Sequence, residues 1–189
     1  MSPTLFEARR AELLTGVIGY IAEYGLAGLS LRPLAAELGT SARMLVHYFG
    51  SKEQMLIAAL TAQRPDIENA FADICDPETL RQRLLDSWSA NTSGPGATST
   101  TVLLQVLGQA CVHDGPFAGY ARAAIDVLVE ALTQVLHRID PAVPDAEASA
   151  TLLVSGIRGL ILDRRITGDT ARTDTAAGQL IDQVIRRYR

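Results

Sequence analysis

Apolar residues recur at intervals of three and four along most of the chain, which is the spacing of one face of an α-helix. This pattern predicts helices over residues 5–24, 117–139 and 145–167. It is most regular near the C-terminus, at Ala177, Leu180, Ile181, Val184, Ile185 and Tyr188. Hydrophobic residues make up 48% of the 189-residue chain, with much alanine and leucine, so the sequence predicts an all-α protein.

Two segments depart from this spacing. Residues 100–112 are apolar around most of the helix circumference, which predicts a helix buried on several sides. Residues 91–99 (NTSGPGATS) are rich in turn formers and lack apolar bulk, so we expect a mobile surface loop there.

Gly156 and Gly159 lie in the middle of a predicted helix, where close approach of another helix would explain them.

Residues 30–63 predict three short helices. Ser30 can cap a helix over 31–38 that ends at Gly39, and Thr40 or Ser41 can cap the next, over 42–48. A third helix follows the turn at Gly50. It begins with Ser51 and Gln54, which fit the S-x-x-E/Q capping box, and ends before Pro65. Two short helices around a glycine turn are the outline of a helix-turn-helix.

The stretch SLRPLAAELGTSARMLVHYFGSKEQML resembles the DNA-binding segment of TetR-type (tetracycline-repressor-like) transcriptional regulators. This resemblance implies a helix-turn-helix DNA-binding domain at 1–50 and a connecting helix at 51–64. It also implies a helical bundle at 65–189 that holds the ligand pocket and the dimer interface. Two residues depart from the family pattern, because Val46 stands where a tyrosine is common and Arg43 where a small residue is common.

The predicted second helix of the motif presents Arg43, whose guanidinium can bind guanine O6 and N7, or else a phosphate or solvent. Met44 could touch a thymine methyl group. The resemblance assigns phosphate contacts to His47 and Tyr48 and to Lys52, the only lysine, which begins the connecting helix beside free backbone amides. The predicted DNA contacts are Arg32, Thr40, Ser41, Arg43, Met44, His47, Tyr48 and Lys52.

The net charge of −4 is unusual for a protein that binds DNA. Residues 1–56 hold five basic and five acidic side chains, so the negative charge lies entirely in the remainder of the chain. The predicted head therefore has no excess of positive charge, and its hold on phosphates must depend on the local placement of a few groups.

The family resemblance implies a homodimer on a near-palindromic double-stranded DNA operator and a small hydrophobic or amphipathic effector. Predicted dimer contacts, which could instead serve only the core of the chain itself, are Leu152, Gly156, Ile157, Leu160, Leu180, Ile181, Val184 and Ile185. Predicted pocket residues, which could equally be plain core, are Trp88, Leu103, Leu107, Cys111, Phe117 and Tyr120. Effector binding is expected to tilt the connecting helix.

The remaining features weigh against other classes of protein. Cys75 and Cys111 lack metal-ligand spacing, which predicts buried, reduced thiols, no metal site and no cofactor. Charges interrupt every apolar run near the N-terminus, so we expect neither a signal peptide nor a membrane span, and a cytoplasmic location. A small helical enzyme using Cys111, His113 and Asp114 is disfavoured, since no acid, base and orienting group stand together. A constitutive DNA-binding or structural helical protein without effector remains an alternative.

Overall fold

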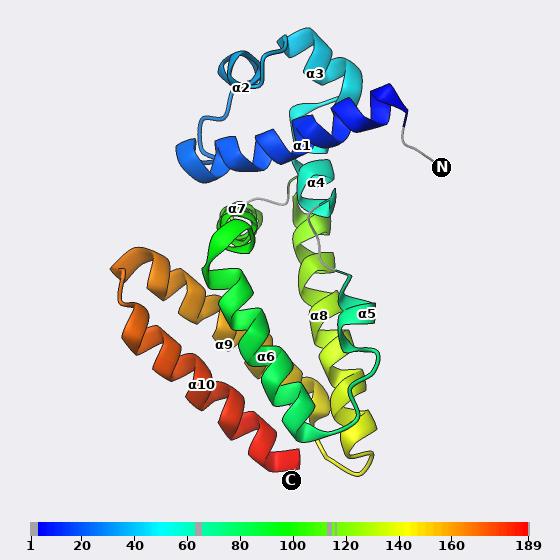
Figure 1. The fold of residues 1–189 in the computed structure, drawn as a ribbon, viewed down its shortest axis with the longest axis vertical. Helices are drawn as coiled ribbons and strands as arrows, with labels where there is room; N and C mark the ends of the chain where they lie inside the picture. Colours follow the sequence, from blue (N-terminus) through cyan, green and yellow to red (C-terminus); the bar gives the residue numbers. More distant parts are fainter. Residues whose placement is uncertain (1–3, 63–65, 113–114, 116, 189) are drawn as a thin grey trace. The chain divides into compact units, whose positions relative to one another are not determined.

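The protein is all-helical over the residues that the computed structural model describes, which are 4–62, 66–112, 115 and 117–188 (Figure 1). This confirms the predicted fold class. The helices are α1 (Leu5–Tyr24), α2 (Leu31–Glu37), α3 (Ala42–Phe49), α4 (Lys52–Ala62), α5 (Ile67–Phe71), α6 (Pro77–Thr92), α7 (Gly94–Ala110), α8 (Ala118–Ile139), α9 (Ala146–Thr167), α10 (Thr170–Ile185) and the 3₁₀ helix η1 (Arg186–Tyr188).

The chain forms two compact units. Unit 1 comprises Met1–Arg64 and Pro95–Ala121, and unit 2 comprises Pro65–Gly94 and Arg122–Arg189. Helix α7 therefore packs with the N-terminal helices, although it lies within the segment predicted as the second domain. Whether function divides at residue 64, as expected from the sequence, stays a prediction.

Unit 1 is built around α1. Thr4 and Glu7 form a capping box at its start, since the Thr4 side chain accepts a hydrogen bond from the Glu7 amide while the Glu7 carboxylate accepts one from the Thr4 amide. That exchange holds the pKa of Glu7 below its usual value. The apolar face of α1 packs in a core with residues of α2, α3 and α4, and this core also contains Val102 and Val106 of α7.

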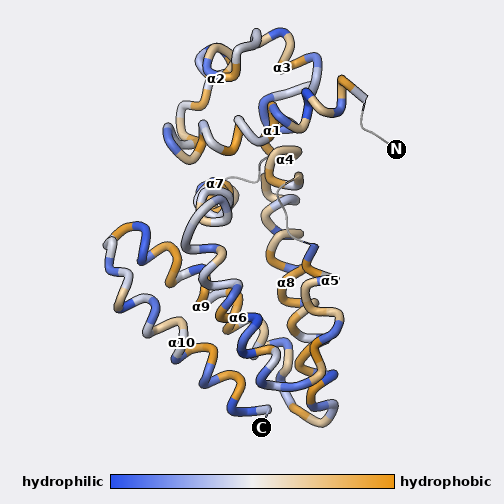
Figure 2. The backbone as a smooth tube through the Cα atoms, viewed as in Figure 1, coloured by the Kyte–Doolittle hydropathy of each residue, from blue (hydrophilic) through white to orange (hydrophobic). Residues whose placement is uncertain are grey.

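Unit 2 centres on α6, α9 and α10, which run side by side (Figure 1). Apolar positions recur along α10 at helical spacing (Figure 2), and Ile181, Val184 and Ile185 are buried in the same core as Leu153 and Val154 of α9. An added Cβ at Gly156 would lie 2.5 Å from Cδ2 of Leu180, so this glycine does permit close approach of α10. No such contact exists at Gly159.

The predicted loop at residues 91–99 is wrong, because α6 and α7 are separated only by Ser93. The turn-forming side chains are satisfied inside helices: Asn91 donates to the Ser87 carbonyl, Thr92 to the Trp88 carbonyl and Ser93 to the Ser89 carbonyl, each four residues back. Pro95 lies in the first turn of α7, where a missing amide hydrogen costs no helical bond.

Two smaller expectations are also corrected. Both cysteines are free, as predicted, but exposed rather than buried, since Cys75 lies directly before the α6 cap and Cys111 directly after the end of α7. Asp145 occupies the cap position of α9 but makes no side-chain cap bond, and its φ is +62°. The predicted cap at this position is therefore absent.

Candidate nucleic-acid interface

Helix α3 exposes polar and apolar side chains to solvent, and two buried side chains anchor it in the core of unit 1. Leu45 and Phe49 are buried in the unit 1 core, whereas Arg43, Met44 and His47 are exposed. Ser41 caps the helix, its hydroxyl accepting a 3.2 Å hydrogen bond from the Met44 amide. Because residues three and four apart share a face of a helix, His47 lies on the same side as both Arg43 and Met44, and these three side chains can reach one groove together.

Aromatic contacts fix the last turn of α3. The Tyr48 ring lies 4.8 Å from the Phe6 ring of α1 and 5.9 Å from the His47 ring, between centroids. The Arg10 guanidinium lies over the Phe49 ring at 5.2 Å. Tyr48 is accordingly half-buried, with its ring held between α1 and α3.

The side chain of Lys52, at the start of α4, makes a hydrogen bond within unit 1. Its Nζ donates a 3.2 Å hydrogen bond to the carbonyl oxygen of Leu29, and the side chain is half-buried. The ammonium retains further N–H donors for a phosphate oxygen. The expected free amide of Ser51 is not free, since it donates to the Phe49 carbonyl.

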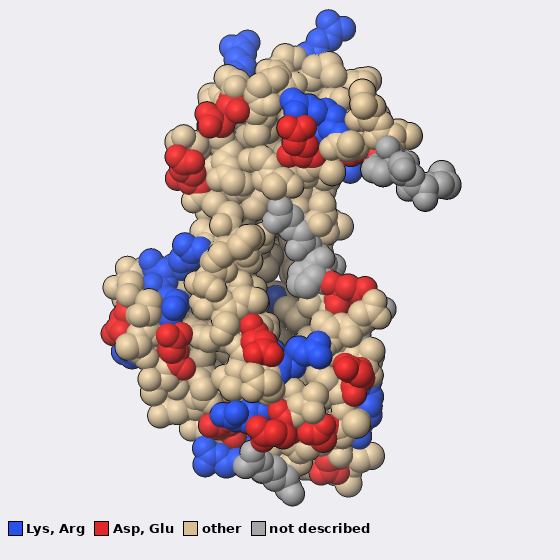
Figure 3. Space-filling model, viewed as in Figure 1, with Lys and Arg blue, Asp and Glu red and all other residues tan. Residues whose placement is uncertain are grey.

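Two more of the predicted contacts flank α3. Arg32 is exposed on α2, and Thr40 is half-buried in the turn, where its amide donates a 2.9 Å hydrogen bond to the Ala35 carbonyl. Basic side chains project over α2 and α3 (Figure 3), and the Lys or Arg residues within these two helices are Arg32 and Arg43. The structure thus brings all eight predicted residues onto α2, α3, the turn between them and the first residue of α4.

The predicted dimer residues fall into two groups. Ile181, Val184 and Ile185 have no more than 1% of their surface exposed, because α6, α8 and α9 of the same chain cover them, so they are withdrawn from the predicted dimer surface. Gly156, Ile157, Leu160 and Leu180 are half-buried, and Leu152 is 51% exposed. The apolar stripe of α10 is therefore an intrachain core stripe.

The predicted pocket residues are divided between the units. Trp88 belongs to unit 2, where its Nε1 donates 2.8 Å to Asp174 and the Arg164 guanidinium lies over its ring. The others belong to unit 1: Phe117 is buried in its core, Leu103, Leu107 and Tyr120 are half-buried, and Cys111 is exposed. Their role in effector binding stays a prediction.

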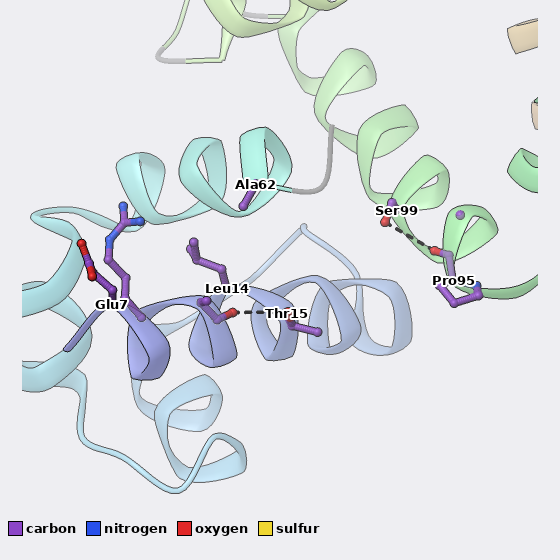
Figure 4. Close-up of a pocket in the computed structure, with 9 residues that line it drawn as sticks. Glu7, Leu14, Thr15, Ala62, Pro95 and Ser99 are labelled. Carbon is purple, nitrogen blue, oxygen red and sulfur yellow. Dashed lines mark hydrogen bonds between the residues drawn. The ribbon is translucent and has the colours of Figure 1, made fainter. Parts of the chain in front are cut away.

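Two hollows are present in unit 1. One, of about 570 Å³, is lined by α1, the end of α4 and the start of α7, and Figure 4 shows Glu7, Leu14, Thr15, Ala62, Pro95 and Ser99 around it. The other, of about 670 Å³, includes Lys52 and Glu53 of α4, Gln105 of α7 and Phe117. Of the predicted pocket residues, only Phe117 lines either hollow.

Gln105 is a residue that the sequence interpretation missed. Its Oε1 accepts a 2.6 Å hydrogen bond from the Leu26 amide, and its Nε2 donates to the Ile21 carbonyl at 3.5 Å. This side chain ties α7 to the end of α1 and the turn that follows it. A single amide within the apolar run VLLQVL was the available signal, since a polar residue in such a run needs a hydrogen-bond partner.

Other kinds of site find little support in the described residues. They contain no group of acidic, histidine and cysteine side chains that could hold a metal ion. His113 and Asp114, considered above as part of an enzyme site, lie outside the described residues. Within the described part of the chain, no helix is both long and apolar enough to cross a membrane.

Comparison with known proteins agrees with this geometry. Residues 18–59 match the family described as bacterial regulatory proteins, tetR family. The chain is 27% identical over 164 residues to the HTH-type transcriptional regulator BetI of Stenotrophomonas maltophilia (strain R551-3), covering 85% of this chain and 83% of that protein.

Solved structures share the fold over nearly the whole chain. NalD, the secondary repressor of the MexAB-OprM multidrug efflux pump in Pseudomonas aeruginosa, superposes with a TM-score of 0.74 at 20% identity, covering 96% of each chain. A SmeT–triclosan complex superposes with a TM-score of 0.79 at 16% identity, covering 95% of this chain and 90% of the other. Residues 18–59 thus carry the segment that defines the tetR family of bacterial regulatory proteins, and the chain shares the fold of these solved structures over nearly its whole length.

Proposed function

We propose that the protein is a ligand-responsive repressor that binds a near-palindromic operator as a homodimer in the cytoplasm. The observation that carries this proposal is the exposed face of α3, where Arg43, Met44 and His47 stand together on a helix anchored by buried Leu45 and Phe49. Such a helix fits the major groove of B-DNA, in which base edges present distinct donor and acceptor patterns.

The neighbouring residues divide into base readers and phosphate contacts. Arg43 is assigned to a guanine and Met44, 39% exposed, to a thymine methyl group. Arg32, Thr40, Ser41, His47, Tyr48 and Lys52 are assigned to the backbone phosphates on either side. This division is consistent with the equal numbers of acidic and basic side chains in residues 1–56. The head then contacts the phosphates through a few hydrogen-bond donors and not through an overall positive charge.

Dimerisation is assigned to the outward face of α9. Five exposed residues follow one another on this face at intervals of three and four, and each is either large and apolar or small: Leu152, Ser155, Gly159, Leu162 and Ile166. Leu162 and Ile166 are 47% and 75% exposed. A stripe of this period packs against a second copy of itself across a two-fold axis.

An effector is proposed from the family and from one related complex. SmeT was solved with triclosan, a small amphipathic molecule, which supports a ligand of similar character here. The candidate contacts for its apolar part are Trp88 in unit 2 and Leu103, Leu107, Cys111, Phe117 and Tyr120 in unit 1. Release of the operator on binding requires only that the ligand favour one of two conformations, with a coupling of about 1 to 3 kcal/mol in typical cases.

Selection of genomic fragments with the purified protein tests the proposal. The wild-type protein should enrich a sequence with two inverted half-sites, and Arg43→Ala should relax the preference at one position in each half-site. Arg122→Ala, which removes an exposed arginine from α8, is the matched control and should give the wild-type sequence. Failure of the wild-type protein to enrich any sequence would refute the proposal.

A further inference from the structure

The half-buried arginines that the structure describes in unit 2 pair with carboxylates, with one exception. Arg81 pairs with Asp182 at 2.7 Å, Arg164 with Asp174 at 2.9 Å and Arg83 with Asp73 at 3.9 Å. Arg158 has no carboxylate within 4.0 Å among the residues that the structure describes, although it lies in the middle of α9 and is half-buried.

The contact that Arg158 does make is a weak substitute for an ion pair. Its NH2 group donates a 2.7 Å hydrogen bond to the carbonyl oxygen of Ala124 on α8. Ala124 lies inside a helix, where its carbonyl already has a helical partner one turn later. The guanidinium thus keeps its full positive charge and several unused N–H donors between α8 and α9.

The surroundings of Arg158 are apolar. Val154 and Ile161, one turn before and one turn after it on α9, are buried, and so is the small side chain of Ala124. This burial lowers the pKa of Arg158, and no neighbouring charge opposes the effect. A charge in such a place destabilises a fold unless a counter-charge accompanies it.

We propose that Arg158 binds the anionic group of the effector, which is therefore an amphipathic carboxylate rather than a neutral or cationic molecule. This inference rests on the proposed ligand response. A planar guanidinium binds a carboxylate through two parallel hydrogen bonds, and a nonpolar body suits the apolar side chains beside it. The missing counter-charge arrives with the ligand, so the ligand neutralises a charge between α8 and α9.

The first test uses the protein without ligand. Arg158→Met retains most of the aliphatic stem and removes the unpaired charge, so it should raise the Tm of the free protein by about 2 °C or more. Arg122→Met, at an exposed position on α8, should leave Tm unchanged. A lower Tm for Arg158→Met would show that the chain already supplies a counter-charge, and would overturn the proposal.

The second test uses octanoate, octanol and octyltrimethylammonium, below their micelle concentrations, as probes with one chain length and different head groups. Octanoate alone should raise Tm and weaken operator binding at least tenfold for the wild-type protein and Arg122→Met. Arg158→Met should lose both effects. An equal response to all three probes, no response to octanoate, or an unchanged response in Arg158→Met would each overturn the proposal.

A partner subunit is the competing source of the counter-charge. If a carboxylate of the second copy paired with Arg158, Arg158→Met would raise the dissociation constant of the dimer at least tenfold in sedimentation equilibrium. That result would overturn the proposal. We expect the dissociation constant to be unchanged. Operator binding by the protein without ligand is measured separately, so failure of the repressor proposal is distinguishable from failure of the carboxylate proposal.

Discussion

The side chain of Gln105 on α7 holds the backbone of Leu26 in the turn after α1, with a hydrogen bond of 2.6 Å from the Leu26 amide to Oε1. Seventy-nine residues separate the two in sequence. Since the same glutamine also donates to the Ile21 carbonyl, its two polar atoms satisfy one donor and one acceptor at the end of α1.

Loss of this contact should loosen the turn. Gln105→Ala leaves the Leu26 amide without its acceptor, so we expect the free energy of unfolding to fall by about 1 to 3 kcal/mol. Hydrogen exchange at Leu26 should accelerate. Gln105→Glu keeps the acceptor but places a carboxylate against the Ile21 carbonyl, and should fall between Gln105→Ala and wild type. Gln109→Ala, an exposed position one turn later, is the control; unaltered exchange at Leu26 in Gln105→Ala would contradict the assignment.

Lys52 should have two separable roles. Lys52→Ala removes the hydrogen bond to the Leu29 carbonyl and also a charge proposed to lie near DNA, so operator binding should weaken. The slope of the logarithm of the binding constant against the logarithm of the salt concentration should become shallower by about one unit. Lys52→Arg keeps the charge and should keep the slope. Fluorescence anisotropy over a range of salt concentrations measures both; a wild-type slope in Lys52→Ala would leave Lys52 with only its bond to Leu29.

Gly156 and Leu180 should be energetically coupled. A Cβ at residue 156 would lie 2.5 Å from Leu180 Cδ2. Gly156→Ala should therefore lower the free energy of unfolding by about 1 to 3 kcal/mol more when Leu180 is present than in the Leu180→Ala background. Urea denaturation of the four proteins gives this difference. Gly178→Ala on α10 meets nothing within 4 Å and should show no coupling to Leu180→Ala.

The outward face of α9 should determine the oligomeric state. Ile166→Glu places a charge at the most exposed large apolar side chain of the proposed contact, and we expect it to convert the dimer to a monomer in light scattering at micromolar concentration. Leu5→Glu changes a side chain that is 92% exposed on α1 and should remain dimeric. A dimer that persists in Ile166→Glu would place the interface elsewhere.

Acid should weaken the α9–α10 connection through Asp163. Arg172 donates to both carboxylate oxygens at 2.7 Å and lowers the pKa of Asp163 from its ordinary value of 3.8. Because the folded-state pKa is the lower one, the stabilisation is complete above that ordinary value and is lost as the pH falls through the folded-state pKa. Thermal unfolding below about pH 4 should show this loss, and Asp163→Asn should remove it. An unchanged pH dependence in Asp163→Asn would contradict this assignment.

The features predicted correctly from sequence are those that neighbouring residues determine. Helix α1 begins and ends where its apolar period and the following Gly25 indicate, and α3 lies between Ser41 and Gly50, the cap and the turn that the sequence predicts. Exposure of Arg43 and burial of Leu45 likewise follow from spacing along one helix.

Two of the features missed depend on partners distant in sequence, and a third depends on side-chain hydrogen bonds within the helices themselves. An apolar stripe on α10 predicts that the face is covered, but it does not say whether α9 of the same chain or a second chain covers it. The polar run at residues 91–99 lacks local apolar spacing, yet its hydroxyls and amides bond back to helical carbonyls and permit two helices to meet at Ser93. The unpaired charge of Arg158 is visible only once α8 is known to lie beside α9.

The packing of α7 limits how this regulator can be re-engineered. Chimeric sensors are made by transplanting the DNA-reading portion of one regulator onto the sensing portion of another, and residue 64 is the obvious place to cut. Such a cut would strip Val102 and Val106 from the core of the transplanted head and leave the Leu26 amide without Gln105. A workable graft has to carry residues 95–121 along with the head, so the recipient must accept two junctions rather than one.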